Sequence, residues 1–421
     1  MPGVVDREQR APSAAFSCRS CGGGSTELIL ALGSTPLANS LVREVSEAPE
    51  PRYPLDLVFC PTCTLVQITE TVPPEILFRD YVYFSSFSDT MLTHASQLAA
   101  RFVRQLGLGP KSLALEVASN DGYLLQYYKK AGVPVLGIEP AQNIARVAVA
   151  ERGVETIAEF FDLPLARTLA REGRRADVVH ANNVLAHVAD LNGFIQGLFE
   201  VLRPAGVAAI EVPYVGDMID GCEFDTIYHE HLSYFSATAL GHVVERHGLK
   251  LVDVERLPIH GGSLLVQIAR ADSSPAPAPA VASLIDDEAR RGMGTIGFYR
   301  DFAARVLDLK DRLRELLSEL KASGKRIAAY GAAAKGSTLL NTFGIGRDVL
   351  EFVADRSQHK QGRFMPGVRL PIVSPEHLLE SMPDYTLLLT WNFAEEILEQ
   401  QKEYLRRGGK FIIPIPTVRV V

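Results

Sequence analysis

The sequence contains few cysteines, no long apolar run and no excess of positive charge. Five cysteines in 421 residues are too few for a disulfide scaffold. No stretch approaches the roughly 18 apolar residues of a membrane-spanning helix, so no membrane contact is expected. The formal net charge of -7 excludes an extended nucleic-acid surface, although a local basic patch for one phosphate-bearing ligand stays compatible with it.

The length of the chain indicates how many domains to expect, and its first residues indicate its location. At 421 residues the chain exceeds what one hydrophobic core usually supports, so two or three domains are expected. A hydrophobic content of 47% and a charged content of 22% are ordinary for a globular protein. The opening MPGVVDREQR carries charges where a secretion signal needs an apolar core, which favours a cytoplasmic location.

Four of the five cysteines form two CxxC pairs, Cys18 with Cys21 and Cys60 with Cys63. Two such turns supply the four thiolates of a closed tetrahedral zinc site, with no coordination position left for catalysis. A redox role is the alternative, but a thioredoxin-like protein has one CxxC at a strand-to-helix junction. We therefore predict a structural zinc ion that folds a small module too short to fold well unaided.

Between residues 91 and 212, short apolar runs alternate with helical patterns. The predicted strands are 112–118, 133–138, 154–157, 177–183 and 207–212, and the predicted helices are 91–106, 122–131, 141–152 and 190–202. This alternation predicts a doubly wound α/β sheet of parallel strands with helices on both faces. An antiparallel pair, 249–257 and 263–269, follows it. The ligand of such a sheet binds beyond the carboxyl ends of its parallel strands.

The loop after the first of these strands contains candidate cofactor-binding residues: Glu116, Ala118, Asn120, Asp121 and Gly122. Its small residues let backbone amides approach a ligand, and its two acids place negative charge nearby. Glu139 and Pro140 end the second strand about 20 positions later, where an acid can bind the two hydroxyls of a ribose. A dinucleotide remains an alternative, but the two acids would repel a pyrophosphate. S-adenosylmethionine, with its sulfonium and ammonium groups, fits better.

Two further candidates lie after the fourth strand, at the predicted carboxyl edge of the sheet. Asn183 and His187 are four positions apart, hence on one face if a helical turn forms there. Such a histidine can also be a hydrogen-bonded core residue.

The stretch EFDTIYHEHLSYFS, residues 223–236, concentrates groups that can exchange a proton. Tyr228, His229, Glu230 and His231 are consecutive, and aromatic residues surround them. Burial beside aromatic rings would shift the pKa of a histidine or glutamate toward neutrality, where general acid and base catalysis is most efficient. Alternatively, His229 and His231 merely satisfy hydrogen bonds.

Two other segments could contact a ligand or have a purely structural role. Residues 76–91 include Tyr81 and Tyr83, and this segment is either a core-facing connector or an aromatic lid over a ligand. His260 stands beside two glycines in the turn of the antiparallel pair, where it either reaches a ligand or belongs to a plain turn.

A Pro/Ala-rich linker, residues 271–283, marks a domain boundary. A long helix over 284–323 follows, with Gly292 and Gly294 expected to break or bend it. The last part repeats the strand-helix alternation, with strands at 326–330, 350–354, 385–390 and 410–414. Lys335 in a small-residue loop, with Lys360 and Arg363 after the second strand, suits a diphosphate, although a solvated basic loop would have the same composition.

Several motifs occur together in this order: paired CxxC, NDG at 120–122, the YxEH of Tyr228, Glu230 and His231, HGG at 260–262, YGAxxK at 330–335 and WNxAEE at 391–396. In these motifs, and over nearly all its length, the chain resembles the S-adenosylmethionine-dependent sugar C-methyltransferases of deoxysugar biosynthesis, such as those that methylate C-3 of dTDP-4-keto-deoxyhexoses. The resemblance implies a zinc-binding domain over 1–75, a class I methyltransferase domain over 76–270 and a C-terminal Rossmann-like nucleotide-sugar-binding domain over 271–421. Ala118 departs from the glycine that class I donor loops commonly have, which puts the detailed shape of this loop in question.

The resemblance also implies a mechanism. A base removes a proton from the carbon next to the ketone, and the resulting enolate takes the methyl group. His231 is the expected base, with Glu230 as the local alternative, while Tyr228 and His187 donate to or orient the keto oxygen. Glu139 would hold the ribose of the methyl donor. Asn120 and Gly122 would form the turn of the chain that binds the donor, and Asn183 would bind the amino-acid end of the donor. Tyr83 is expected among the catalytic residues, closing the sugar pocket from the lid segment. The expected substrate-binding residues are Tyr81, also over the sugar, with His260, Lys335, Lys360, Arg363 and Asn392.

The expected ligands are therefore S-adenosylmethionine, a structural zinc ion and a dTDP-linked sugar nucleotide, with monomer or weak dimer left open. Three other hypotheses remain. The acceptor is a natural-product ring methylated at oxygen, nitrogen or carbon; the protein is a zinc-containing scaffold without turnover; or His229 and His231 hold a catalytic metal with His187. The catalytic-metal hypothesis needs a third ligand besides His229 and His231, and no residue near them in the sequence has a suitable spacing.

Overall fold

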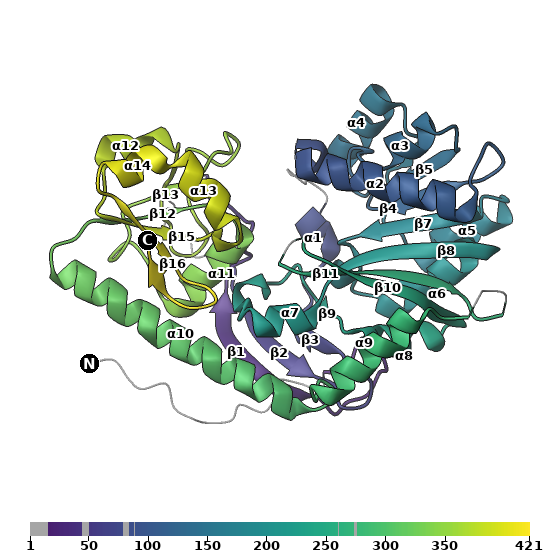
Figure 1. Ribbon diagram of the computed structural model, residues 1–421, viewed down its shortest axis with the longest axis horizontal. Helices are drawn as coiled ribbons and strands as arrows, with labels where there is room; N and C mark the ends of the chain where they lie inside the picture. The colour runs from purple at the N-terminus through teal and green to yellow at the C-terminus, as the bar shows by residue number, and fades with distance from the viewer. Residues whose placement is uncertain (1–15, 44–49, 79–83, 88, 260, 273–275) are drawn as a thin grey trace.

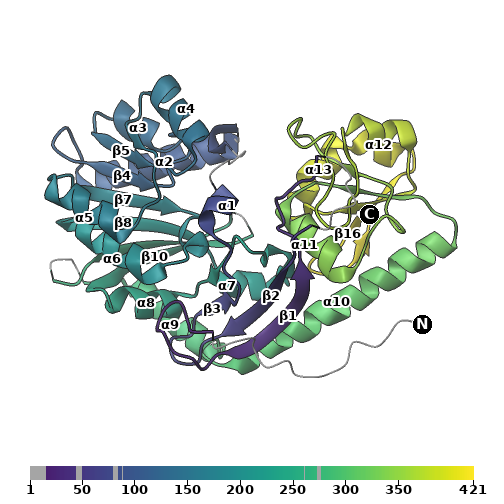
Figure 2. The same ribbon diagram turned by 180° about the vertical axis from the view of Figure 1, so that it is seen from behind.

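The computed structural model describes residues 16–43, 50–78, 84–87, 89–259, 261–272 and 276–421. The strands of these ranges form three sheets. Figure 1 shows two large lobes, one built from the middle of the chain and one from its C-terminal part. The N-terminal strands and the long helix α10 run below and between them, as the view from behind also shows (Figure 2).

The N-terminal sheet is antiparallel, with strand order β1-β2-β3-β9. Its strands are β1 (Glu27–Thr35), β2 (Tyr53–Phe59), β3 (Val66–Ile68) and β9 (Ser233–Tyr234). Strand β9 comes from the middle of the chain, directly after the Tyr228 to His231 run, and Val66 pairs with Tyr234. The zinc-binding module thus holds the segment that contains the candidate base.

The middle sheet has the strand order β10-β11-β8-β7-β4-β5-β6. Strands β4 to β8 are parallel, and β11 is antiparallel to both of its neighbours. The bounds are β4 (Ala114–Val117), β5 (Val135–Ile138), β6 (Thr156–Ile157), β7 (Ala176–Asn182), β8 (Leu202–Pro213), β10 (Leu249–Leu257) and β11 (Ser263–Arg270). This is the predicted doubly wound sheet with the predicted antiparallel pair at one side.

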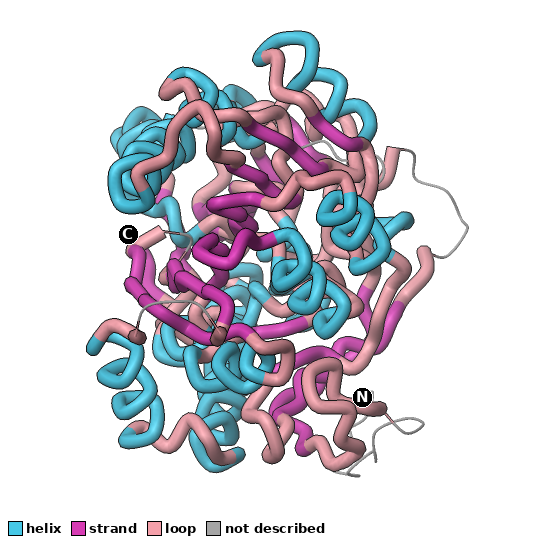
Figure 3. Tube along the Cα trace, turned by 90° about the vertical axis from the view of Figure 1, so that its right-hand side faces the viewer, coloured by secondary structure: helices cyan, strands magenta, loops and turns pink. Residues whose placement is uncertain are grey.

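Helices cover both faces of this sheet and form two hydrophobic cores. Buried residues of α2 (Asp89–Leu106), α3 (Leu125–Lys130) and α4 (Gln142–Arg152) belong to one core. Those of α5 (Leu163–Arg171), α6 (Leu191–Val201) and α8 (Ala237–Glu245) belong to the other. Figure 3 shows the strands enclosed between the helices. Because both faces are covered, the carboxyl ends of the parallel strands are left to form a site.

The C-terminal sheet has the order β14-β13-β12-β15-β16-β17 and is parallel except for β17. Its strands are β12 (Ile327–Tyr330), β13 (Val353–Ala354), β14 (Ile372–Val373), β15 (Tyr385–Leu388), β16 (Lys410–Ile413) and β17 (Arg419–Val420). The prediction found the four central strands. It missed β14 and β17, because two-residue strands carry too little periodicity to recognise.

Two helices connect the two lobes. The break between them is at the glycines where the sequence predicted it. Helix α9 (Pro279–Arg290) ends just before Gly292, which has φ +76°, and α10 (Ile296–Ala322) follows. Residues at helical spacing form the buried stripe of α10: Tyr299, Phe302, Val306, Leu309, Leu313 and Leu317. Its Tyr299 ring lies 5.1 Å from the Phe59 ring, so α10 packs against the zinc-binding module.

The remaining helices are short: α1 (Pro74–Phe78), α7 (Val215–Asp220), α11 (Ala334–Phe343), α12 (Glu376–Ser381), α13 (Ala394–Gln400), α14 (Lys402–Arg406), and the 3₁₀ turns η1 (Ser85–Phe87), η2 (Leu185–His187), η3 (Phe224–Thr226) and η4 (Trp391–Phe393). Within the described ranges, no helix combines the length and the apolar character needed to cross a bilayer.

Candidate active site

The four cysteines of the CxxC pairs converge on one point. Their sulfur atoms all lie within 4.8 Å of one another. Cys18 and Cys63 are 3.5 Å apart, and Cys21 and Cys60 are 3.6 Å apart. Ligands at about 2.3 Å from a tetrahedral zinc ion have sulfur atoms about 3.8 Å apart, so the four thiolates fit this metal. Gln67 donates from Nε2 to Cys18 Sγ at 3.1 Å and would orient that ligand.

The loop after β4 contains three residues with positive φ. Ala118 and Asn120 have φ of +51° and +48°, and Gly122 has φ +79°. Alanine therefore occupies the left-handed region that glycine adopts freely, at a local cost of about 1 kcal/mol. The turn thus has a left-handed residue at position 118 although it lacks a glycine there.

Glu139 ties this loop to the end of β5. Its Oε2 accepts from the Asn120 amide at 2.9 Å, and its Oε1 accepts from the Ala141 amide at 2.8 Å, past Pro140. Burial raises the pKa of Glu139. Each carboxylate oxygen keeps a second lone pair, so ribose binding stays a prediction for this residue.

The charge at the loop differs from what two acids alone would give. Burial, and then the proximity of Glu139, raise the pKa of Glu116 well above its ordinary value, which favours its neutral form. Asp121 pairs with Arg152 at 3.3 Å, and the Ser86 hydroxyl donates to it. Asp121 is thus held by a cation on one side and by the lid segment on the other.

Serines of the predicted lid segment dock on the same loop. The Ser85 amide donates to Asn120 Oδ1 at 2.9 Å, in addition to the contact of Ser86 with Asp121. Only Tyr81 and Tyr83 of this segment were predicted as site residues, and its serines were not. Tyr81 and Tyr83 lie outside the described residues.

Asn183 and His187 are both at the carboxyl edge of the sheet, but they do not share a helical face. Asn183 has φ +56°, and the turn η2 begins only at Leu185. Asn183 Nδ2 donates to Glu211 Oε1 at 3.2 Å, and its amide donates to the Glu211 carbonyl at 2.7 Å. His94 Nε2 lies 2.7 Å from Glu211 Oε2, which raises the pKa of His94. Glu211 and His94 were not among the predicted site residues, although an acid inside the apolar β8 run was a signal.

His231, Tyr228 and His187 form one cluster. His231 Nδ1 donates to the Thr226 carbonyl at 2.8 Å, so the proton of the neutral ring is on Nδ1. Its Nε2 then accepts from the Tyr228 hydroxyl at 3.0 Å. The rings of His187 and His231 are 4.9 Å apart, and His187 Nδ1 donates to the Glu230 carbonyl at 2.7 Å. Burial, and next the proximity of His187, lower the pKa of His231 to about 3.

The neighbours of His231 point in different directions. Asn39 of the zinc-binding module donates from Nδ2 to Glu230 Oε1 at 2.7 Å, a contact that the sequence did not reveal. Burial raises the pKa of Glu230 to about 7. The His229 ring donates from Nε2 to the Pro54 carbonyl at 3.0 Å and therefore faces the module, away from the cluster.

Among the described residues, the four cysteines are the one group of three or more ligand atoms close enough for a metal ion.

The predicted substrate residues of the C-terminal domain have varied surroundings. Lys335 lies 3.5 Å from Glu223 and above the Trp391 ring, at the contact with the middle domain. Lys360 donates to the Ala332 carbonyl at 2.9 Å, which ties it to the loop after β12. Arg363 follows in the next turn, and Asn392 is in η4. His260 lies outside the described residues.

Family comparisons match three successive parts of the chain. Residues 18–78 match a zinc binding domain, residues 91–254 a methyltransferase domain and residues 258–416 a C-methyltransferase C-terminal domain. The C-methyltransferase NovU of Streptomyces niveus is 39% identical over 405 residues, which make up 96% of each chain. The chain belongs to the C-methyltransferase family.

Other methyltransferases match a smaller share of this C-methyltransferase, at lower identity. The ubiquinone biosynthesis O-methyltransferase of Bartonella tribocorum is 25% identical over 149 residues, or 33% of this chain and 60% of that protein. The structure of magnesium protoporphyrin IX methyltransferase from Synechocystis PCC 6803 with bound SAH has a TM-score of 0.34 and 14% identity, covering 42% of this chain and 82% of that one.

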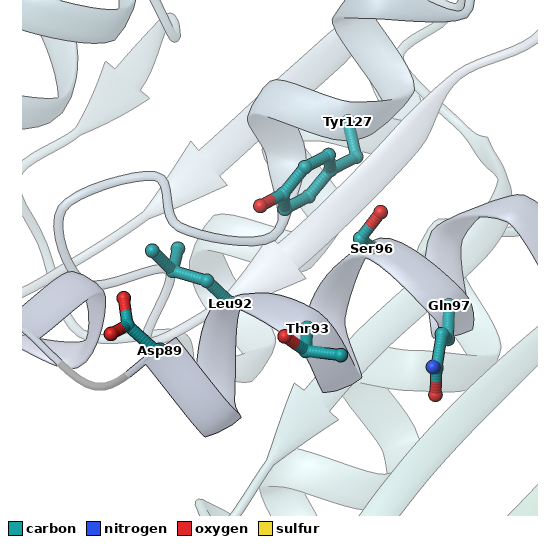
Figure 4. A pocket seen from close by; sticks show the side chains of 6 residues that line it. All are labelled: Asp89, Leu92, Thr93, Ser96, Gln97 and Tyr127. Atoms are coloured by element: carbon teal, nitrogen blue, oxygen red, sulfur yellow. The ribbon is translucent and has the colours of Figure 1, made fainter.

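A surface pocket of the C-methyltransferase lies apart from these residues. Figure 4 shows it on α2 and α3, where Asp89, Leu92, Thr93, Ser96, Gln97 and Tyr127 line it. Asp89, Thr93 and Gln97 are exposed, and none of the six is a predicted site residue. The pocket is therefore not a candidate for the active site.

Proposed function

We propose that this C-methyltransferase transfers the methyl group of S-adenosylmethionine to the carbon next to the ketone of a nucleotide-linked 4-keto-deoxysugar, through an enolate. The observation that carries the proposal is the cluster of His231, Tyr228 and His187. A C–H bond beside a ketone needs a base and a hydrogen-bond donor for the developing oxyanion. The 3.0 Å contact between His231 Nε2 and the Tyr228 hydroxyl brings such a base and such a donor together.

The donor site is the loop after β4 with its neighbours. Asn120, Asp121 and Gly122 approach the cofactor, Glu139 binds its ribose, and Asn183 lies at its amino-acid end. The Glu211 carboxylate accepts from Asn183 and contacts His94, which fixes the Asn183 turn. We assign the sulfonium group to the space over the carboxyl ends of β4 and β7, the two central strands of the sheet.

Two groups compete for the role of base, and geometry and acidity favour different ones. The His231 ring is partly exposed and is oriented by the Thr226 carbonyl, whereas the Glu230 carboxylate is 6% exposed and bound by Asn39. The pKa of about 7 would suit Glu230 for proton abstraction at neutral pH. Because a base must first reach the substrate, we assign the role to His231.

The pH dependence of proton abstraction separates the two assignments. Below its pKa of about 7, Glu230 is protonated and cannot act as a base. With its pKa lowered to about 3, His231 is neutral and its Nε2 stays unprotonated throughout the range from about pH 5.5 to 8. We expect Glu230→Gln to exchange the substrate proton for solvent deuterium at a rate that is flat across that range. Loss of exchange in Glu230→Gln, together with a wild-type rate that falls about tenfold per pH unit below 7, would assign the base to Glu230.

The substrate class is tested by ligand-induced stabilisation. A ligand at about 100 times its Kd stabilises the protein by about 2.7 kcal/mol, which shifts the melting temperature of a large domain by several degrees. We expect dTDP to raise the melting temperature more than ADP, UDP or GDP when S-adenosylhomocysteine is present. Arg363→Gln is the matched variant, and it should abolish this shift but not the one caused by S-adenosylhomocysteine. A panel in which no nucleoside diphosphate acts would favour a natural-product ring as acceptor.

A further inference from the structure

The C-terminal domain packs on the segment that orients His231. Helix α11 of that domain contacts the turn η3, and the Phe343 ring stacks on the Phe224 ring at 4.6 Å with 14° between their planes. The turn η3 ends at Thr226, whose carbonyl accepts the Nδ1 proton of His231. A movement of α11 therefore displaces the group that sets the tautomer of the candidate base.

Buried polar contacts reinforce this packing. The Trp391 indole donates from Nε1 to Asp225 Oδ2 at 2.7 Å, and Asp225 is fully buried. The Lys335 ammonium lies 3.5 Å from Glu223 Oε2 and 4.9 Å from the centre of the Trp391 ring. Lys335 and Trp391 come from the C-terminal domain, whereas both carboxylates flank or belong to η3. Buried hydrogen bonds and ion contacts of this kind, shielded from water, fix orientation more firmly than apolar packing alone.

Gly261 lies beside the Glu223 carboxylate of this cluster. Gly261 has φ +90°, and a Cβ atom there would lie 2.5 Å from Glu223 Oε2. The backbone at Gly261 is therefore in contact with the carboxylate. With Lys335 of α11 and Gly261 both close to it, Glu223 has little freedom to move.

Within η3, hydrogen bonds carry the position of the carboxylates to the Thr226 carbonyl. The Thr226 amide donates to the Glu223 carbonyl at 3.1 Å, and the Thr226 hydroxyl donates to the same oxygen at 2.7 Å. The Ile227 amide donates to the Phe224 carbonyl at 3.0 Å. The peptide between Thr226 and Ile227 is thus held by the same turn that Asp225 anchors.

We propose that Lys335 and Trp391 are positioning residues for proton abstraction: by holding Glu223 and Asp225, the C-terminal domain keeps the Thr226 carbonyl on His231 Nδ1 and so keeps Nε2 unprotonated and able to act as base. This inference rests on the proposed function and adds a task for the C-terminal domain besides substrate binding. Lys335 and Trp391 act through η3 and need not touch the reacting atoms.

Trp391→Phe is the decisive variant, because it keeps an aromatic ring under Lys335 and removes only the donor to Asp225. We expect kcat, and the rate of solvent deuterium exchange into the substrate, to fall about 10- to 100-fold together. KM and the affinity for S-adenosylhomocysteine should change less than about threefold. Asp225→Asn, which keeps an oxygen acceptor for the indole but loses the charge, should give a smaller loss.

A spectroscopic measurement reports the tautomer directly. In ¹⁵N-histidine NMR of the ligand-free wild type, His231 should show the Nδ1–H pattern, assigned by its disappearance in His231→Asn. Trp391→Phe should convert part of this signal to the Nε2–H pattern. Glu50→Gln is the matched control, because Glu50 joins the zinc-binding module to Arg369 of the C-terminal domain without contacting η3. It should leave the His231 signal and kcat unchanged.

An unchanged His231 signal in Trp391→Phe would overturn the inference, as would a raised KM at constant kcat. A failure of the proposed function would look different: the wild type itself would exchange no proton of any 4-keto sugar nucleotide, while the NMR comparison would still decide the positioning role.

Discussion

Replacing His231 with asparagine is expected to slow methyl transfer by about 10³-fold, the loss typical of removing a general base. The asparagine amide can still donate to the Thr226 carbonyl, which His231 Nδ1 reaches at 2.8 Å, so the loop should keep its shape. Solvent deuterium exchange into the substrate, measured with S-adenosylhomocysteine bound, should fall by the same factor because it reports proton abstraction alone. Affinity for S-adenosylhomocysteine should change less than about threefold.

His229→Asn is the matched control for this prediction. His229 is also a histidine and lies two positions before His231. Its ring donates to the Pro54 carbonyl, and the residue is 1% exposed. This substitution should lower the melting temperature, since it removes the hydrogen bond and the packing of a buried ring, and should leave the exchange rate within about tenfold of the wild type. Retention of exchange in His231→Asn would remove His231 from the role and leave Glu230 as the base.

Loss of the zinc ion is expected to abolish both the fold of the N-terminal module and catalysis. Cys60→Ser should reduce the metal content from one zinc per chain and lower the melting temperature by about 10 °C or more, because structural zinc sites contribute about 10 kcal/mol to small modules. Activity should disappear with the fold, since β3 pairs with β9 just after His231 and Asn39 binds Glu230. Elemental analysis, thermal unfolding and turnover measure the three effects.

Cys222→Ser provides the control for the zinc site. Cys222 is the fifth cysteine, buried and outside the CxxC pairs, so its substitution should leave the zinc content unchanged. Full turnover in zinc-free Cys60→Ser would show that the module is dispensable for the active site. Two zinc ions per wild-type chain would instead support a second metal at His187, His229 or His231.

Some contacts of the site could not have been predicted from the sequence. Asn39 binds Glu230 across 191 positions, and Trp391 binds Asp225 across 166. Glu211 reaches Asn183 from a neighbouring strand. Sequence periodicity reports which face of an element is buried, but it does not report which distant side chain meets a polar group there. The pairing of β9 with the zinc-binding module was not predicted either, because β9 is only two residues long.

The sequence by itself determined the features that depend on short spacing: the two CxxC pairs, the strand-helix alternation, the glycine break before α10 and the proton-exchanging run around His231. These are local because a thiolate pair, a strand or a helix turn is fixed by residues a few positions apart. Only the tertiary structure decided which way the neighbours of His231 point, which acids are neutralised by burial and which domains hold the turn η3. Those outcomes depend on desolvation and on contacts between distant segments, and both exist only once the chain is packed.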